Sequence, residues 1–118
     1  MAHCFDFDDA HTGGAGHPSA PLWAATLAMA GHLGSSEKEA IAAFLTGFEV
    51  MTKLGGGGIE GVGRTTARRG FHPTGNLVPF GAAAVASQML GLSGDQWAHA
   101  LGIAATQAAG LLASGGTM

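Results

Sequence analysis

The chain has 118 residues, of which 47% are hydrophobic and only 11% are Asp, Glu, Lys or Arg. This length suffices for one domain with a modest hydrophobic core but not for two, and so few charged residues cannot cover the surface of a free-standing domain. The net charge of −3 and the total of five Lys and Arg residues argue against a nucleic-acid partner. We therefore expect one unit that packs against more protein.

A single cysteine, Cys4, excludes an internal disulfide and is typical of a reducing compartment. The polar and acidic N-terminus lacks the basic and then apolar run of a signal peptide, so we expect a cytoplasmic protein. The segment between Arg69 and Asp95 has no Asp, Glu, Lys or Arg, but its apolar part, residues 77–92, is shorter than the ~20 apolar residues of a membrane span. We interpret it as helix buried in protein, and we expect no membrane contact.

The first segment, residues 5–19, holds three carboxylates and two histidines in a chain with little charge elsewhere. Asp8 and Asp9 have an ordinary interpretation as turn carboxylates. Asp6 lies between two Phe residues, where an apolar setting raises the cost of an ionised carboxylate, so a turn role explains it less well. A glycine-rich link follows, and His17 then precedes a proline at the start of a helical pattern.

Two helical patterns come next. Residues 19–33 form the first, with Ser19 as the candidate N-cap, Pro21 in the first turn and a glycine after the last apolar residue. The second begins with the capping box of residues 36–39. The apolar stripe that we expect to be buried in this helix recurs at helical spacing: Ile41, Phe44, Leu45, Phe48 and Met51.

A run of four glycines at 55–58 ends the second helix and begins a loop that we expect to extend to about Arg69. The loop does not contain the G-x-x-x-x-G-K-[ST] sequence of a phosphate-binding loop, and no strand pattern precedes it. We interpret it as a connection between helices. Its arginines, Arg64, Arg68 and Arg69, come shortly before His72 and could supply cationic contacts to an acidic ligand.

Helical patterns also cover residues 76–92, with Pro79 in the first turn, and the stretch up to Leu112 that follows the capping box of residues 93–96. Their alanines and glycines allow helices to approach closely and indicate burial on nearly all sides. No run of alternating β-branched residues is long enough for a strand. We therefore predict an all-α fold, with residues 1–118 as one helical segment.

A second His-Pro pair, at His72, stands like His17 at the entrance of a helical pattern, and this repetition favours a shared site over two structural histidines. A metal site is the alternative for the N-terminal residues. Its mixed nitrogen and oxygen ligands would come from His3, Asp6, Asp8, Asp9, His11 and His17. The spacing contains no H-x-x-x-H pair and no cysteine pair, so we predict no tightly bound metal.

Several motifs, in order along nearly the whole chain, resemble the MmgE/PrpD family, which includes 2-methylcitrate dehydratase and cis-aconitate decarboxylase. They are Phe5-Asp6-Phe7-Asp8-Asp9 with His17-Pro18-Ser19, Gly70-Phe71-His72-Pro73-Thr74-Gly75, the segments 79–84 and 100–111, and Gly116-Thr117-Met118. The resemblance implies that this chain is the helical-bundle core of a large helical domain, which is joined to a smaller α+β lid. It further implies a homodimer, and reactions at a carbon next to a carboxylate without metal or organic cofactor.

The resemblance also implies which residues line the site, with Asp6, His17 and His72 as catalytic residues. Ala10 replaces the hydroxyl residue that often follows the Asp-Asp pair, so Thr12 or water is expected to contact the substrate. A lysine is expected two residues after the Gly-Thr-Met motif, beyond the last residue of the chain. Because this lysine lies outside the chain, we expect the chain alone to be inactive. Because its second half has a long stretch without charged residues, we also expect the chain alone to associate strongly.

Dehydration of a hydroxy tricarboxylate needs a base near the α-carbon, an acid for the leaving hydroxyl and cations for the carboxylates. Histidine suits the first two roles at neutral pH, and Arg68 or Arg69 is the candidate for the third. We expect an MmgE/PrpD-like lyase, a 2-methylcitrate dehydratase-type hydro-lyase that acts on a small polycarboxylate without a cofactor. The alternatives are a small helical metal-binding domain and a non-catalytic helical interaction module. Shared acid-base chemistry does not distinguish dehydration, decarboxylation and isomerisation.

Overall fold

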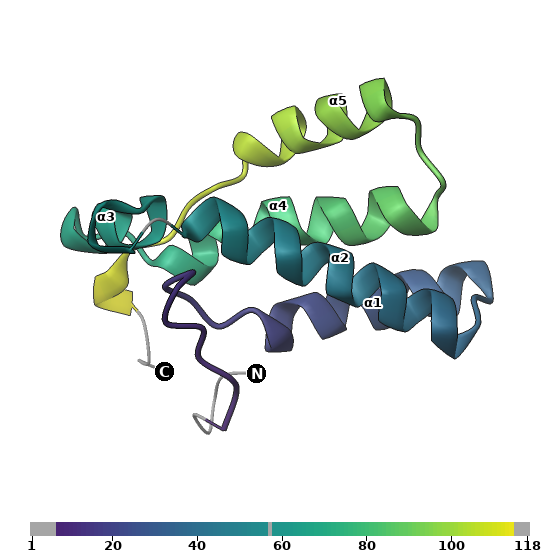
Figure 1. The fold of residues 1–118 in the computed structure, drawn as a ribbon, viewed down its shortest axis with the longest axis horizontal. Coiled ribbons are helices and arrows are strands. Elements are labelled where there is room, and N and C mark those ends of the chain that lie inside the picture. The colour runs from purple at the N-terminus through teal and green to yellow at the C-terminus, as the bar shows by residue number, and fades with distance from the viewer. Residues whose placement is uncertain (1–6, 57, 115–118) are drawn as a thin grey trace.

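A computed structural model describes residues 7–56 and 58–114 of the chain (Figure 1). Within these residues the chain forms five α-helices and two short 3₁₀ helices, and the only β-type pairing is two isolated bridges. The prediction of an all-α fold is confirmed. In chain order the elements are α1 (Ser19–Leu33), α2 (Glu37–Gly55), η1 (Gly58–Glu60), α3 (Val62–Arg68), α4 (Pro73–Met89), α5 (Gly94–Ala105) and η2 (Leu112–Ser114).

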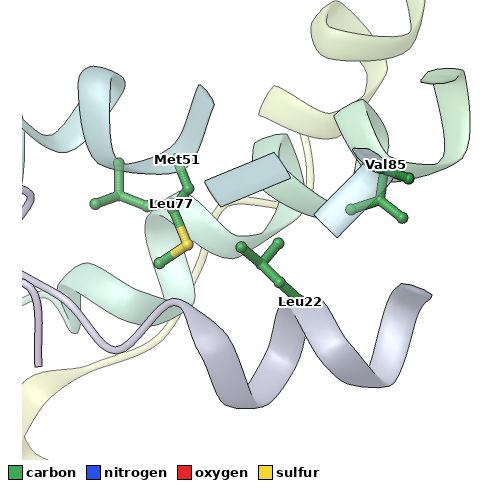
Figure 2. Packing of buried hydrophobic residues seen from close by; sticks show 5 residues of the cluster. Leu22, Met51, Leu77 and Val85 are labelled. Carbon is green, nitrogen blue, oxygen red and sulfur yellow. The ribbon is translucent and has the colours of Figure 1, made fainter. Parts of the chain in front are cut away.

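Helix α4 is the central helix of this arrangement. It packs against α1, α2, α3 and α5, and its contact with α2 is the most extensive between any two of the described elements. In Figure 1, α1 and α2 lie on one side of α4 and α5 lies on the other. The hydrophobic core lies where α1, α2 and α4 meet (Figure 2), and its buried residues are Leu22, Ala43, Met51, Leu77 and Val85.

The contact between α2 and α4 depends on small residues. A Cβ atom on Gly47 would lie 2.6 Å from Val85 Cγ2 and 2.8 Å from the carbonyl oxygen of Gly81. Both distances are shorter than van der Waals contact, so glycine is needed for the two helices to approach this closely. Ala40 and Ala43 lie on the same face of α2 and are buried as well. Helix α2 therefore meets its neighbours through a face of small side chains.

This packing corrects part of the apolar stripe expected for α2. Ile41 and Leu45 are 50% and 55% exposed, whereas Met51 is buried in the core and Phe44 and Phe48 pack at its edge. The prediction assumed that the larger apolar side chains face the neighbouring helix. The close approach of α2 and α4 instead leaves room mainly for small ones, and some large side chains lie outside the contact.

The start of α1 also differs from the prediction. Ser19 is the first residue of α1 rather than its N-cap, and the N-cap residue, Pro18, makes no side-chain capping bond. The backbone N–H of Ser19 donates instead to Asp9 Oδ1 at 3.0 Å. A carboxylate from the preceding segment thus caps this helix, and a cap of this kind is not visible in the local sequence pattern.

Three further boundaries differ from those predicted. The loop expected up to Arg69 contains the 3₁₀ helix η1 and the helix α3. Helix α4 begins at Pro73, which needs no partner for a backbone N–H at a helix start, so Pro79 lies in the helix interior and not in the first turn. Helix α5 ends at Ala105 and does not continue to Leu112.

Burial on nearly all sides was predicted for residues 76–92 and for the stretch up to Leu112. It is found for α4, whose residues are all buried or half-buried except Gln88. It is not found for α5, where most residues are exposed and Ile103 is 68% exposed. No helix in residues 7–56 and 58–114 is both long enough and apolar enough to cross a membrane.

Both predicted capping boxes are present. In α2, Ser36 Oγ accepts from the backbone N–H of Glu39 at 3.3 Å, and the backbone N–H of Ser36 donates to Glu39 Oε2 at 2.8 Å. In α5, the same two bonds join Ser93 and Gln96, at 3.4 and 2.9 Å. Of the two pairs that close these boxes, only Ser36 and Glu39 include an ionisable side chain. Hydrogen bonds from the Ser36 hydroxyl and then from its backbone N–H lower the pKa of Glu39 below its ordinary value of 4.5.

We expect Ser36→Ala to cost stability in a pH-dependent way and Ser93→Ala in a pH-independent way. Because the pKa of Glu39 is lower in the folded chain, its stabilising contribution is fully present above 4.5 and is lost as the pH falls through the folded value. Urea unfolding at neutral pH and at roughly pH 3 should show a smaller cost of Ser36→Ala in acid. Ser93→Ala should cost about 1 kcal/mol in both. An equal cost of Ser36→Ala at the two pH values would contradict the prediction.

Candidate active site

A cavity of about 300 Å³ lies beside the N-terminal segment, α3 and the start of α4. Its lining residues are Ala10, His11, Thr12, Ala15, Gly16, His17, Arg64, His72, Pro73, Thr74 and Leu112. The lining includes three histidines and one arginine. Two of these histidines, His17 and His72, are the ones that the His-Pro motifs place at helix entrances.

The N-terminal wall of the cavity is a tight turn that begins at His11. The backbone N–H of His11 donates to the carbonyl oxygen of Gly16 at 2.9 Å. Ala15 has a φ of 55°, a left-handed conformation that a residue with a Cβ atom keeps only where its surroundings hold it. The end of α2 supplies that support, because a Cβ atom on Gly55 would collide with the carbonyl oxygen of Gly14. Glycine at position 55 therefore lets the turn pack directly on α2.

His17 lines the cavity at the junction between this turn and α1. Its backbone N–H donates to Thr74 Oγ1 on α4 at 3.0 Å, which joins the two helix entrances. Its ring Nδ1 lies 2.8 Å from the carbonyl oxygen of Asp9. A carbonyl oxygen only accepts, so Nδ1 carries the proton and the neutral ring is unprotonated at Nε2. This tautomer can accept a proton at Nε2, as a general base must.

Two aspartates of the acidic motif support His17, although they also have an ordinary interpretation as turn carboxylates. The side chain of Asp8 is only 8% exposed, and its Oδ2 lies 3.5 Å from His17 Nδ1. A carboxylate beside Nδ1 orients an imidazole. Asp9 holds the same region together from the other side, because its carboxylate caps α1 and its carbonyl oxygen accepts from His17.

His72 is the N-cap residue of α4. Its backbone N–H donates to the carbonyl oxygen of Gly110 at 3.0 Å, and its own carbonyl oxygen accepts from the backbone and side-chain N–H groups of Asn76 at 3.0 and 2.8 Å. The backbone N–H of Leu112 donates to the carbonyl oxygen of Gly70 at 2.8 Å. The segment after α5 therefore pairs with the residues before α4, which fixes the backbone of His72 at the cavity wall.

Among the three arginines, Arg64 lines the cavity and Arg68 and Arg69 do not. Arg64 Nη2 donates to the carbonyl oxygen of Thr12 at 3.3 Å. Arg68 lies one helical turn further along α3, and its guanidinium lies 3.5 Å from a carboxylate oxygen of Glu60. The helix that was expected to be a loop thus determines which arginine reaches the cavity.

Of the predicted site residues, His17, His72 and Thr12 lie together on this cavity. Arg68 and Arg69, predicted to contact the substrate, are not among its lining residues. Asp6, predicted to be catalytic, lies outside the described residues.

Two lining residues, His11 and Arg64, were not among the predicted catalytic or substrate-binding residues, although Arg64 was named with Arg68 and Arg69 as a possible contact to an acidic ligand. His11 was considered only as a metal ligand. Arg64 was one of three loop arginines, and a helical interpretation of residues 62–68 would have separated it from Arg68. No three His, Cys, Asp or Glu side chains in the described ranges are grouped so that they could hold a metal ion.

The fold is a helical arrangement in which two helix entrances place histidines on a common cavity. The chain belongs to the MmgE/PrpD family, because the sequence profile of the MmgE/PrpD N-terminal domain matches residues 1–118. The chain is also similar to the cis-aconitate decarboxylase-like protein oryM of Aspergillus oryzae (strain ATCC 42149 / RIB 40), with 34% identity over 116 residues. That match covers 92% of this chain but 23% of the relative, so the chain spans about a quarter of that protein's length. The family resemblance predicted from the motifs is confirmed.

Proposed function

We propose that this domain contributes acid-base groups to the active site of an MmgE/PrpD-type lyase, a 2-methylcitrate dehydratase-type hydro-lyase that acts on a small polycarboxylate. The observation that carries the proposal is the common cavity of His17 and His72, which two separate helix entrances bring together. Membership of the MmgE/PrpD family supports lyase chemistry at the level of the family.

In a dehydration, a base removes a proton from the carbon next to a carboxylate. The C–O bond breaks, an acid protonates the leaving hydroxyl, and a C=C bond and water are formed. His17 suits the base, because its neutral ring is unprotonated at Nε2. The protonated form of His72, on the same cavity, suits the acid. Asp6 remains a proposed catalytic residue because it matches the family motif. Neither the proton removal nor the protonation of the leaving hydroxyl needs a cofactor.

A decarboxylation is the second candidate reaction, and the relative described as cis-aconitate decarboxylase-like favours it. Loss of CO₂ leaves a carbanion that takes up a proton, which an imidazolium can supply. A full-length MmgE/PrpD protein that carries this domain should be assayed on 2-methylcitrate, citrate and cis-aconitate. Formation of the C=C bond would be followed by absorbance and release of CO₂ measured separately. Turnover of none of the three would contradict the proposed lyase.

Arg64 is the cation that we propose for a substrate carboxylate, in place of Arg68 or Arg69. We expect Arg64→Gln to raise KM about tenfold or more, as the loss of a hydrogen bond to a charged group does. Arg68→Gln is the matched control, because Arg68 lies one turn away on α3 and pairs with Glu60 instead. Steady-state kinetics of the two variants should separate them. A raised KM for Arg68→Gln with a normal value for Arg64→Gln would restore the earlier candidate.

We also propose that further protein covers the apolar surface of this domain, either in a homodimer or through other parts of the helical domain. Large apolar side chains are exposed on α1, α2 and α5, among them Leu27, Ile41, Leu45 and Ile103. Large exposed apolar areas typically mark an interface, and a chain with only 11% charged residues has few charged side chains on its surface. A cytoplasmic location fits the single cysteine of the sequence.

A further inference from the structure

His11 differs from His17 in the hydrogen bond that its ring makes. The backbone N–H of Gly14 donates to His11 Nδ1 at 2.8 Å. A backbone N–H only donates, so Nδ1 is unprotonated and the neutral ring carries its proton on Nε2. His17 has the opposite tautomer, because its Nδ1 donates to the carbonyl oxygen of Asp9. The cavity is therefore lined by one imidazole with a proton on Nε2 and by another without one.

Other contacts hold the ring of His11 in place. It lies edge-on to the ring of Phe48, with centroids 5.6 Å apart and an interplanar angle of 88°, and Phe48 itself packs against the core. The bond from Gly14 closes a turn that packs on the end of α2 at Gly55. The ring is thus oriented before any ligand binds. A donor that is already fixed loses little conformational entropy when it is used.

We propose that His11 binds a carboxylate group of the polycarboxylate through its Nε2–H, as a substrate-binding residue and not as an acid-base residue. This assignment rests on the proposed function. Arg64 lines the same cavity and donates to the carbonyl oxygen of Thr12, the residue after His11, so the cavity holds a cationic group as well as the proposed donor. The carboxylate subsite then lies on the N-terminal turn, and the acid-base pair lies at the two helix entrances.

The first test is the tautomer and its response to a ligand, measured by NMR on the chain labelled with ¹⁵N-histidine. Long-range ¹H–¹⁵N correlations should show a proton on Nε2 of His11 and on Nδ1 of His17. Adding propane-1,2,3-tricarboxylate, which has no hydroxyl to lose, should shift the His11 resonances. The exposed His32 and His99, on α1 and α5, should not respond. A proton on Nδ1 of His11, or no shift on saturation, would overturn the proposal.

The second test is the affinity of variants for the same tricarboxylate, measured by calorimetry. His11→Phe keeps a ring but removes the donor, and we expect it to raise Kd about tenfold or more. His11→Gln keeps an N–H near the position of Nε2 and should stay within about threefold of wild type. His99→Phe is the control and should not change Kd. An unchanged Kd for His11→Phe, or an equal loss in both His11 variants, would overturn the proposal. If His11→Phe does not fold, the affinity of His11→Gln and the tautomer decide.

Kinetics of a full-length MmgE/PrpD protein that carries this domain separate this proposal from the proposed function. His11→Phe should raise KM while kcat and its pH dependence are retained, because the acid-base pair is intact. Turnover with a normal KM in His11→Phe would refute the substrate-binding role of His11 but would not contradict the proposed lyase function. Binding of the tricarboxylate that depends on His11, without turnover of any substrate, would refute the lyase and leave the carboxylate subsite.

Discussion

Replacing His17 or His72 by alanine is expected to lower kcat about a hundredfold or more in a full-length MmgE/PrpD protein that carries this domain. Both residues line the cavity, and His17 has the tautomer that a general base requires. The side chain of His17 is 42% exposed, and the bonds that join both residues to their surroundings include several from the backbone. The free energy of unfolding should therefore change little.

Histidines outside the cavity provide the controls for this experiment. His32 on α1 and His99 on α5 are exposed and do not line it, so alanine at either position should leave kcat unchanged. Steady-state kinetics and thermal melts should be measured on all four variants. The pH dependence of kcat/KM should lose one limb in each site variant, because each removes one titrating group. Wild-type turnover in both site variants, or activity lost only through unfolding, would show that the histidines are structural.

Local hydrogen bonds were the part of this fold that the sequence predicts best. The two capping boxes pair residues three positions apart, Ser36 with Glu39 and Ser93 with Gln96. Donor and acceptor are thus brought together by the first turn of the helix itself. For the same reason the all-α class followed from helical spacing and turn residues, because both depend on neighbours within one or two turns.

Contacts between distant segments account for what the sequence did not predict. The cap of α1 comes from Asp9, ten positions before the N–H that it binds at Ser19. The packed face of α2 is set by how closely α4 approaches Gly47. In each case the local pattern offered a reasonable candidate, namely Ser19 itself or the larger apolar residues, and tertiary packing selected another.

In the candidate site, too, local sequence patterns predicted some features, and contacts between distant segments determined the others. The His-Pro motifs predicted that His17 and His72 share a site, because both stand at helix entrances, and both line the cavity. A sequence pattern that predicts a loop over residues 55–69 does not separate Arg64 from Arg68, whereas α3 places them one helical turn apart. The bond between His11 and Gly14 spans only three positions, but the sequence does not show that the ring lies on the cavity and against Phe48.

The docking of α1, which carries His17 at its entrance, depends on Leu22. Leu22 is fully buried. A Cβ atom added to Gly81 would lie 2.7 Å from Leu22 Cδ2, and one added to Gly47 would lie 3.3 Å from the same atom. Leu22 thus occupies the space that two glycines leave open between α2 and α4. Among the described residues, Leu22 is the one residue of α1 in the core cluster. Thr26 of α1 is also buried, and Trp23 stacks on Phe44 of α2 with ring centroids 4.3 Å apart.

We therefore expect Leu22→Ala to lower the free energy of unfolding by roughly 2–5 kcal/mol, because it removes buried methyl groups and leaves a cavity beside glycines that cannot fill it. Leu27→Ala is the matched control on the same helix. Leu27 is 64% exposed, so its truncation should cost less than about 0.5 kcal/mol. Urea unfolding followed by circular dichroism would measure both, with equal m-values as the condition for comparing them. Equal costs at the two positions would mean that α1 does not dock on α2 and α4 through Leu22. A large cost at position 22 alone would show that α1, the helix with His17 at its entrance, is held on α2 and α4 largely through Leu22.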